Sequence, residues 1–335
     1  MRRLNLILLA LLFIGLSGYS QMVPIHSKDY SLKAYPHTVR FKKYETDTLY
    51  TENEKRVSFI DDYELEFNED RKLIKKTNFI KGNSDRYSIF TYNVNRSLEK
   101  EELFEPVSGK LVSTVSYKYD YLGKLAEVIT TEYPVSLGGA NKMVRKETYK
   151  HNPNGQIAEY SIYGDDETLH KTIEYFYGPQ DSLIYTVTKS GYNRNIEKTT
   201  YKRDFALYVS EMIIHRNDSQ VRREVYERDE NYRIIKKKVY SGKNRLTLEY
   251  RYEYDQHGYI TSEIGLDRKG NWALEYYYKY EKDEYFNWTK KTTYDGWEPK
   301  YIETREITYS RKEHFYDDLK DEDTEKVVRE DYDEW

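Results

Sequence analysis

Residues 117–125 read Tyr-Lys-Tyr-Asp-Tyr-Leu-Gly-Lys-Leu, and residues 252–260 read Tyr-Glu-Tyr-Asp-Gln-His-Gly-Tyr-Ile. In both stretches tyrosines alternate with polar residues up to an Asp, a Gly follows three positions later, and an aliphatic residue ends the stretch. Such alternation is typical of a half-buried β-strand. Asp and Gly at the strand end indicate a chain reversal, because Asp can bond the backbone of a turn and Gly adopts left-handed geometry without strain. Each stretch therefore predicts a strand, a turn and a second strand.

This unit recurs along the chain. The aromatic anchors, each with the residue three positions later, are Phe67 with Asp70, Tyr92 with Asn95, Tyr117 with Asp120, Tyr149 with Asn152, Tyr175 with Gly178, Tyr201 with Asp204, Tyr226 with Asp229, Tyr252 with Asp255, and Tyr280 with Asp283. Most anchors are 25 or 26 residues apart, and the longest interval, 32, contains an expected loop insertion at 133–139. A fixed period of this length marks a repeat architecture. We predict about nine units whose turn residues are Asp70, Asn95, Asp120, Asn152, Asp204, Asp229, Asp255 and Asp283.

The repeat predicts an all-β fold. Two strands per unit give roughly eighteen antiparallel strands, and tyrosine suits them because the ring can be buried while the hydroxyl reaches water. A sheet of this size cannot stay flat, since neighbouring strands twist by about 20 to 25°, so it must curl, spiral or close on itself. We predict a repetitive array of β-hairpins that forms a long, twisted or curled sheet. A β-propeller with two units per four-stranded blade is the alternative.

Composition excludes several classes of protein. The chain has 335 residues with 38 Tyr and no Cys, so disulfide scaffolds and thiolate metal sites are excluded. Charged residues make up 33% and the mean hydropathy is −0.95, which excludes a bundle of membrane-spanning helices. Lys and Arg are interspersed with Glu and Asp, whereas a nucleic-acid-binding surface needs a clustered positive patch. We expect no nucleic-acid partner, no metal and no cofactor.

The N-terminus has the pattern of a signal peptide over residues 1–20. A basic start is followed by an apolar run over 4–16, and small residues, Gly18 and Ser20, precede the expected cleavage point. We expect an exported protein that is periplasmic, secreted or associated with the cell surface. No membrane span is expected after removal of the signal, and the lack of Cys excludes a lipoprotein.

The rest of the chain divides into three parts. Residues 21–62 are expected to form lead-in strands, 63–310 the repeat domain, and 311–335 an acidic tail. A charge run of this kind is usually a solvated, flexible end. The tail lacks the glycine and the final Glu of a calcium-binding loop, so we expect no metal there.

The repeat units resemble a known family. Residues 117–125, 252–260 and 283–291 look like YD repeats of Rhs-type proteins, and more closely like the short secreted YD-repeat proteins of Bacteroidota. Residues 28–33 and the chain up to Tyr44 are similar to the lead-in strand of those proteins, so the resemblance covers about 28–310. Phe286 stands where such units often have Gly. Large Rhs and teneurin proteins wind many repeats into a shell around a toxin or effector. We do not expect that role here, because the self-cleavage motif and toxin domain are missing.

No motif for catalysis emerges from the sequence. The seven His form no His-Glu-x-x-His pattern, and no Gly-x-Ser-x-Gly elbow, phosphate-binding loop or dinucleotide-binding pattern is found. We therefore expect a structural or interaction module that binds an envelope polysaccharide or a protein through its aromatic sheet surface. An envelope hydrolase with its site in the concavity of the curled sheet is the alternative.

The expected ligand-binding residues are aromatic side chains of the last units. Aromatic rings give large contact areas at low entropic cost, which suits binding surfaces. The candidates are Trp272, Trp288, Trp297, Tyr276 and Tyr278. The same rings could instead cap the end of the sheet, as terminal repeats often require.

Overall fold

The computed structural model describes residues 26–46, 57–80, 82–133, 142–192 and 195–310. The predicted signal peptide and acidic tail lie outside these ranges. The described residues form two 3-10 helices, η1 (Ser27–Tyr30) and η2 (Pro179–Asp181), and twenty strands. The strands are β1 (Pro36–Thr46), β2 (Val57–Phe67), β3 (Leu73–Ile80), β4 (Asn83–Tyr92), β5 (Leu98–Phe104), β6 (Leu111–Tyr119), β7 (Leu125–Glu132), β8 (Met143–His151), β9 (Ile157–Tyr163), β10 (Leu169–Tyr177), β11 (Leu183–Ser190), β12 (Ile196–Arg203), β13 (Val209–Arg216), β14 (Ser219–Arg228), β15 (Ile234–Ser241), β16 (Leu246–Tyr254), β17 (Ile260–Asp267), β18 (Trp272–Lys282), β19 (Trp288–Asp295) and β20 (Glu298–Tyr309).

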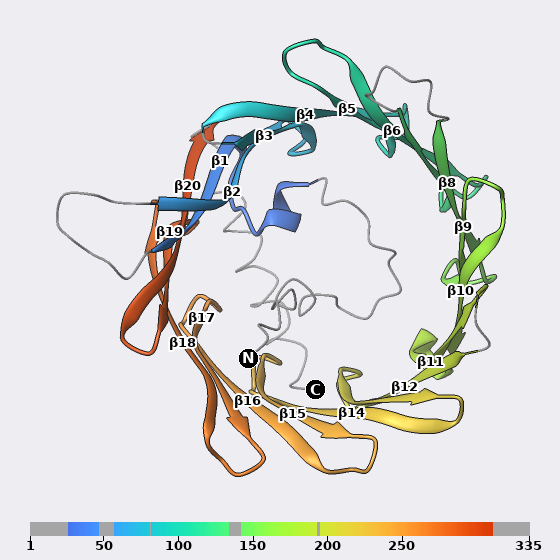
Figure 1. The fold of residues 1–335 in the computed structure, drawn as a ribbon, viewed down its shortest axis with the longest axis vertical. Helices are drawn as coiled ribbons and strands as arrows, with labels where there is room; N and C mark the ends of the chain where they lie inside the picture. The colour runs from blue at the N-terminus through green and yellow to red at the C-terminus, as the bar shows by residue number, and fades with distance from the viewer. Residues whose placement is uncertain (1–25, 47–56, 81, 134–141, 193–194, 311–335) are drawn as a thin grey trace, which may run out of the picture.

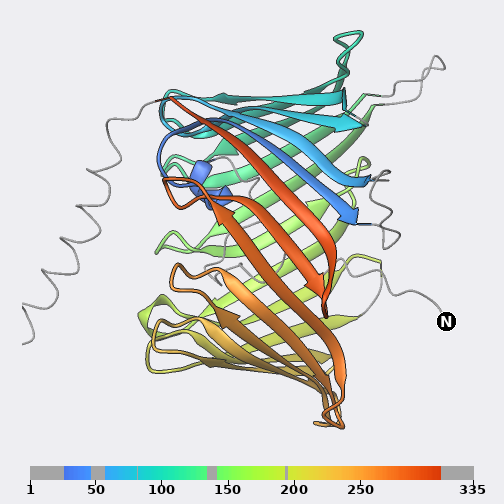
Figure 2. The same ribbon diagram turned by 90° about the vertical axis from the view of Figure 1, so that its left-hand side faces the viewer.

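The strands form one closed antiparallel barrel. Each strand pairs with its neighbours in sequence, and β20 also pairs with β1, so that the described part of the sheet is a ring (Figure 1). The strands are tilted relative to the barrel axis (Figure 2), as closure requires. The predicted long, twisted or curled sheet is therefore wrong in topology, and so is the propeller alternative. The all-β fold built from antiparallel hairpins agrees with the prediction.

Closure depends on the two strands that flank the nine hairpins. The repeat supplies β2 to β19, the lead-in adds β1, and the chain beyond the last unit adds β20. β1 lies between β2 and β20, with Val39 opposite both Leu65 and Ile307. A twisted sheet coils as strands are added. When its edges meet, pairing removes two rows of unpaired backbone groups, which favours the closed form.

Nine tight turns lie at one end of the barrel, which we call the anchor end. Within the described chain they begin at Asn68, Asn93, Asp120, Asn152, Gly178, Asp204, Asp229, Asp255 and Asp283. In the turn that begins at Asp255, the Oδ1 atom accepts hydrogen bonds from the N–H groups of His257 and Tyr259, both at 2.9 Å. In the first two units, Asp70 and Asn95 lie two residues after the turn residues Asn68 and Asn93.

The fourth residue of every anchor turn has a positive φ. Gly occupies that place at Gly123, Gly155 and Gly258, whereas other units have non-Gly residues, such as Leu207 with φ 65° and Phe286 with φ 59°. The left-handed conformation costs non-Gly residues roughly 1–2 kcal/mol. The Asp and Asn hydrogen bonds hold the turn in place despite this cost.

Many tyrosines have a repeated structural role. Near the anchor end, a tyrosine hydroxyl donates a hydrogen bond to a backbone carbonyl of the preceding hairpin. The acceptor is the first residue of the second strand of that hairpin. The pairs are Tyr92 with Leu73, Tyr119 with Leu98, Tyr177 with Ile157, Tyr254 with Ile234 and Tyr280 with Ile260, at 2.6–3.0 Å. Arg203 and Arg228 make the equivalent bonds to Leu183 and Val209. These bonds connect seven of the eight successive pairs of hairpins in the described chain and account for part of the tyrosine excess.

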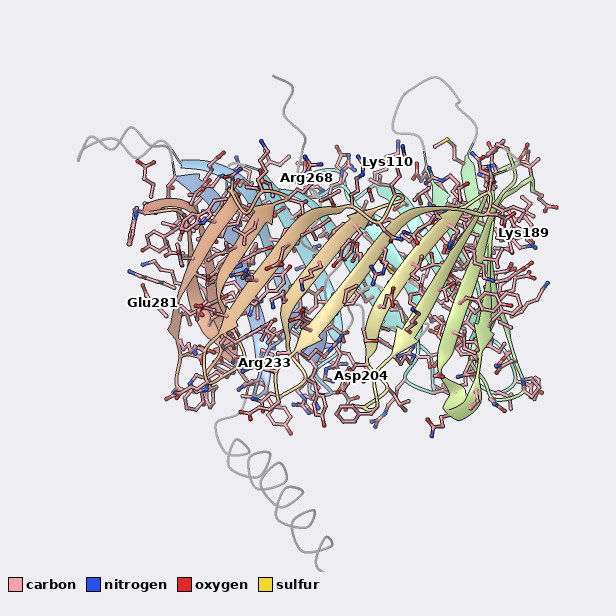
Figure 3. All side chains as sticks on the ribbon, turned by 90° about the horizontal axis from the view of Figure 1, so that it is seen from below. Lys110, Lys189, Asp204, Arg233, Arg268 and Glu281 are labelled. Atoms are coloured by element: carbon pink, nitrogen blue, oxygen red, sulfur yellow. The ribbon has the colours of Figure 1, made fainter. Side chains whose placement is uncertain are left out.

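The two faces of the sheet differ. Successive side chains point inward and outward in turn, and the inner face is the one that carries η1 (Figure 1). The outer face bears a cross-strand ion pair in seven of the described hairpins, and one of the seven is Glu174–Lys189 at 2.5 Å. The other six are Glu66–Lys75, Lys118–Glu127, Lys150–Glu159, Lys202–Glu211, Glu227–Lys236 and Glu281–Lys290, at 2.6–2.8 Å. Figure 3 shows Glu281 and Lys189 at the outside of the wall, with Asp204 and Arg233 at the anchor end and Arg268 and Lys110 at the other.

The best-packed core lies where the lead-in segment covers the inner face. We call residues 26–35 the clasp. Its Leu32 packs in a buried cluster with side chains from β1 to β5, namely Val39, Leu65, Phe67, Leu73, Phe90 and Leu98. The Asn287 side chain accepts from the Lys33 N–H at 2.6 Å and donates to the Lys33 carbonyl at 3.2 Å. Arg305 donates to the Tyr30 carbonyl at 3.1 Å. The clasp thus joins the first units to the last.

Candidate binding site on the inner face

A closed ring of twenty strands is wide enough to leave space inside its wall. Twenty strands about 4.8 Å apart and tilted by about 40° make a ring roughly 40 Å across between opposite backbones. Barrels of sixteen to eighteen strands already leave an aqueous channel, whereas eight strands are filled by their own side chains. Inward side chains are therefore available for contact with water or a ligand wherever they are exposed. Two inward arginines, Arg145 and Arg222, have side chains that are 55% and 41% exposed.

The first inner-face cluster lies on β8 and β9 and consists of Arg145, Glu147, Tyr149 and Tyr160, the β8 cluster. Arg145 contacts Oε1 of Glu147 at 2.8 Å. Oε2 of Glu147 accepts hydrogen bonds from the hydroxyls of Tyr149 at 3.0 Å and Tyr160 at 2.7 Å. The two tyrosine rings stack with centroids 5.0 Å apart. Burial, and then the hydrogen bond to Glu147, raise the pKa of Tyr160, so its phenol remains a proton donor.

The second cluster lies on β14 and β15 and consists of Arg222, Glu224, Tyr226 and Lys237, the β14 cluster. Arg222 contacts Oε1 of Glu224, and the hydroxyl of Tyr226 donates to Oε2 at 2.6 Å. Lys237 faces Tyr226 in the register and lies 3.9 Å from the same Oε2. Burial, and then Glu224, raise the pKa of Tyr226. The carboxylate is therefore held in one orientation by neighbours on both of its oxygens.

A third cluster continues along the inner face over β17 to β20 and onto β1. The hydroxyl of Tyr278 donates to Glu263 at 3.0 Å, and the Lys291 ammonium lies 5.0 Å from the centre of the Tyr278 ring. Lys291 and Lys43 both approach Glu303, at 3.5 and 3.4 Å. Burial raises the pKa of Glu263 and lowers that of Lys291. These groups are mostly buried, and they stabilise the wall more than they offer contacts.

The predicted aromatic candidates do not form one surface. Trp288 is buried on the inner face, where the Arg305 guanidinium lies 3.7 Å from its ring centre. Trp272 and Trp297 are exposed at the end opposite the anchor end, Trp272 at the start of β18 and Trp297 in the turn between β19 and β20. Tyr278 is buried against Glu263.

Tyr276 is partly buried and accepts a hydrogen bond from Lys300 at 3.2 Å. The structure thus separates Trp288 from Trp272 and Trp297, and it places the two tyrosines within the inner wall. Their expected part in ligand binding remains a hypothesis that these positions do not support as one continuous surface.

The β8 and β14 clusters were missed in the sequence analysis. Their signal is a shared pattern, Arg-x-Glu-x-Tyr, at 145–149 and at 222–226, and each pattern ends on a repeat anchor. Alignment of the units on their anchors would place the two motifs at the same register. Whether such side chains point inward could not be read from the sequence, because both faces of the strands carry charges.

Neither a metal site nor a helical membrane span is found in the described part of the chain. Its residues include no group of three or more His, Cys, Asp or Glu side chains placed to hold a metal ion. No helix within those ranges is long and apolar enough to cross a membrane.

Comparisons with known proteins give no family assignment. No family model matches the chain, and no curated protein matches it. Solved structures that it is similar to include the crystal structure of TcdB2-TccC3-Cdc42, at 13% identity and a TM-score of 0.31, covering 70% of this chain and 16% of that one. They also include a porin-like protein from Bacteroides uniformis, at 12% identity and a TM-score of 0.35, covering 82% of this chain and 98% of that one. A porin-like protein from Bacteroides vulgatus is 10% identical with a TM-score of 0.28, and the match covers 84% of this chain and 100% of that one.

Proposed function

We propose that this protein is an exported interaction module whose barrel is surrounded by water. It binds a hydroxyl-rich glycan of the cell envelope on its inner wall. Export rests on the signal-peptide pattern of residues 1–20. The binding role rests on the inner-face clusters, with the Arg145–Glu147–Tyr160 arrangement as the observation that carries it.

The outer face supports a barrel that is surrounded by water. Lipid-facing barrels carry an apolar band about 25 Å tall on their outer surface. Here the outward positions carry ion pairs, and Glu127 and Glu227 each approach two lysines on the same face. A charged side chain at the middle of a bilayer is costly. Water on both sides of the wall is the environment that fits this pattern.

The inner clusters suit sugars because they offer three kinds of contact together. Arginine has five N–H donors, and the ion pair with glutamate uses only part of them. Glutamate oxygens can accept further hydrogen bonds, and the partly exposed Tyr160 ring, stacked on the buried Tyr149, presents an apolar edge. A sugar has hydroxyls that both donate and accept, and apolar C–H faces. Since each Arg is already paired with a Glu, the β8 cluster has no net charge and favours a neutral ligand.

A binding screen with matched variants tests this proposal. The purified protein is applied to an array of envelope glycans, and the affinity for each ligand found is measured by titration calorimetry. Arg145→Ala or Arg222→Ala should weaken binding at least tenfold, because each removes oriented donors.

Arg251→Ala is the matched control. Arg251 pairs with Glu249 at 2.8 Å and its side chain is 56% exposed, but it lies on the outer face. This variant should bind within twofold of the wild type. An array without any binding glycan, or equal loss of affinity in the control, would contradict the proposal.

A further inference from the structure

The β8 and β14 clusters share one arrangement of arginine, glutamate and tyrosine, and they differ in the residue opposite the tyrosine, which is Tyr160 in one and Lys237 in the other. In each, the arginine approaches Oε1 of the glutamate, and the tyrosine of the same strand donates to Oε2. In each, the glutamate lies five residues before its turn residue, Asn152 or Asp229. The anchor tyrosines also face equivalent positions on the next strand, where Tyr149 is opposite Tyr160 and Tyr226 is opposite Lys237.

Two like sites on one concave wall suit a ligand with repeating groups. We infer that the β8 and β14 clusters are two copies of one sugar subsite, and that the ligand is a linear glycan long enough to occupy both at once. This inference rests on the proposed function and adds the size class of the ligand and the number of subsites.

The position of the clusters sets the length that the glycan must span. β8 and β14 are six strands apart in the ring. Six of the twenty strands cover about 108° of a ring roughly 40 Å across, which is roughly 38 Å along the backbone wall. The inward side chains lie on a smaller radius of about 15 Å, where the straight path between the clusters is about 25 Å. Arg145 and Arg222 are both partly exposed and point to the same enclosed space. An extended oligosaccharide shorter than this span reaches only one cluster.

Simultaneous binding changes affinity in a recognisable way. When one end of the ligand is bound, the second subsite meets the other end at a high effective concentration, and the combined affinity can exceed that of one site by about 10²–10⁴-fold. Short fragments gain nothing from the second site, and they should fill the two clusters independently. The number of fragments bound per protein therefore reports the number of subsites.

The experiment uses soluble β-1,3-glucan, mannan and dextran, each as a short fraction below 25 Å and a long fraction above it. Calorimetry is performed on wild-type protein, Arg145→Ala, Arg222→Ala, the double variant and the outer-face control Arg251→Ala. For the polymer that binds, we expect two short fragments per wild-type chain, one per single variant and none for the double variant. The long fraction should bind one to one and at least tenfold more tightly, and each single variant should abolish that gain.

The outcomes separate this inference from the proposed function. One short fragment per wild-type chain, or an equal affinity of short and long fractions, would overturn the two-subsite inference while leaving glycan binding intact. Failure of all three polymers to bind would count against the proposed function and the inference together. Tryptophan fluorescence and thermal unfolding of each variant show whether it is folded.

Discussion

Asn287→Ala tests the role of the clasp in holding the barrel closed. The Asn287 side chain is fully buried and makes three hydrogen bonds, two to the backbone of Lys33 and one to the Tyr309 hydroxyl. At about 1 kcal/mol for each net hydrogen bond, the variant should lose about 3 kcal/mol of stability. The Tm of a domain of this size changes by about 2 °C for each kcal/mol of stability lost, so Tm should fall by about 6 °C. Thermal unfolding followed by circular dichroism measures the shift.

A control and a local readout make this prediction specific. Asn271→Ala removes an exposed amide that donates to Asp267 at 3.1 Å in a turn at the opposite end, and it should cost less than about 0.5 kcal/mol. Hydrogen exchange of residues 26–35 should accelerate in Asn287→Ala and stay unchanged in the control. Equal Tm values for both variants, or unchanged exchange in the clasp, would refute the role given to Asn287.

Two further predictions concern the turns and the buried carboxylates. Leu207 has a φ of 65° in an anchor turn, so Leu207→Gly should relieve strain and stabilise the fold by up to about 1 kcal/mol. Gly258→Ala should destabilise the fold by a similar amount. A lower Tm for Leu207→Gly would contradict the strain argument. Burial raises the pKa of Glu263 in the folded state. The contribution of Glu263 to folding stability is therefore fully present below about pH 4.3, and it is lost as the pH rises through the raised pKa. Glu263→Gln should therefore gain Tm relative to the wild type between pH 4 and pH 7, and a Tm difference independent of pH would contradict this.

The repeat could be predicted because its signal is local. The alternation around Tyr117 and Tyr252 and the turn residues Asp120 and Asp255 act within a few residues, and the structure has strands and turns at these places. In the first two units the turns begin at Asn68 and Asn93, just after the aromatic residue. A short, degenerate motif fixes the period of a repeat better than its register.

Closure and the inner-face clusters depend on contacts between distant residues. The Asn287 amide recognises the backbone of Lys33, 254 positions earlier, and no local pattern indicates such a pairing. The face that each strand turns inward depends on the curvature of the whole ring. Both faces carry Lys and Glu, so hydrophobic alternation did not distinguish the inward Glu224 from the outward Glu227. The tryptophans were grouped by sequence, although their strand positions place Trp288 at the anchor end and Trp272 and Trp297 at the other end.

The closure of the barrel is tested most directly by a disulfide across its seam. Lys42 on β1 is opposite Thr304 on β20, and antiparallel partners lie about 4.5–5.5 Å apart, within disulfide range. The chain has no cysteine of its own, so Lys42→Cys with Thr304→Cys adds a single pair. Lys42→Cys with Thr292→Cys, which places the second cysteine on β19, is the control. On mild oxidation, non-reducing electrophoresis and mass spectrometry should show a near-complete intramolecular disulfide in the first variant and little in the control. Failure of the first pair to form it would contradict the closed barrel.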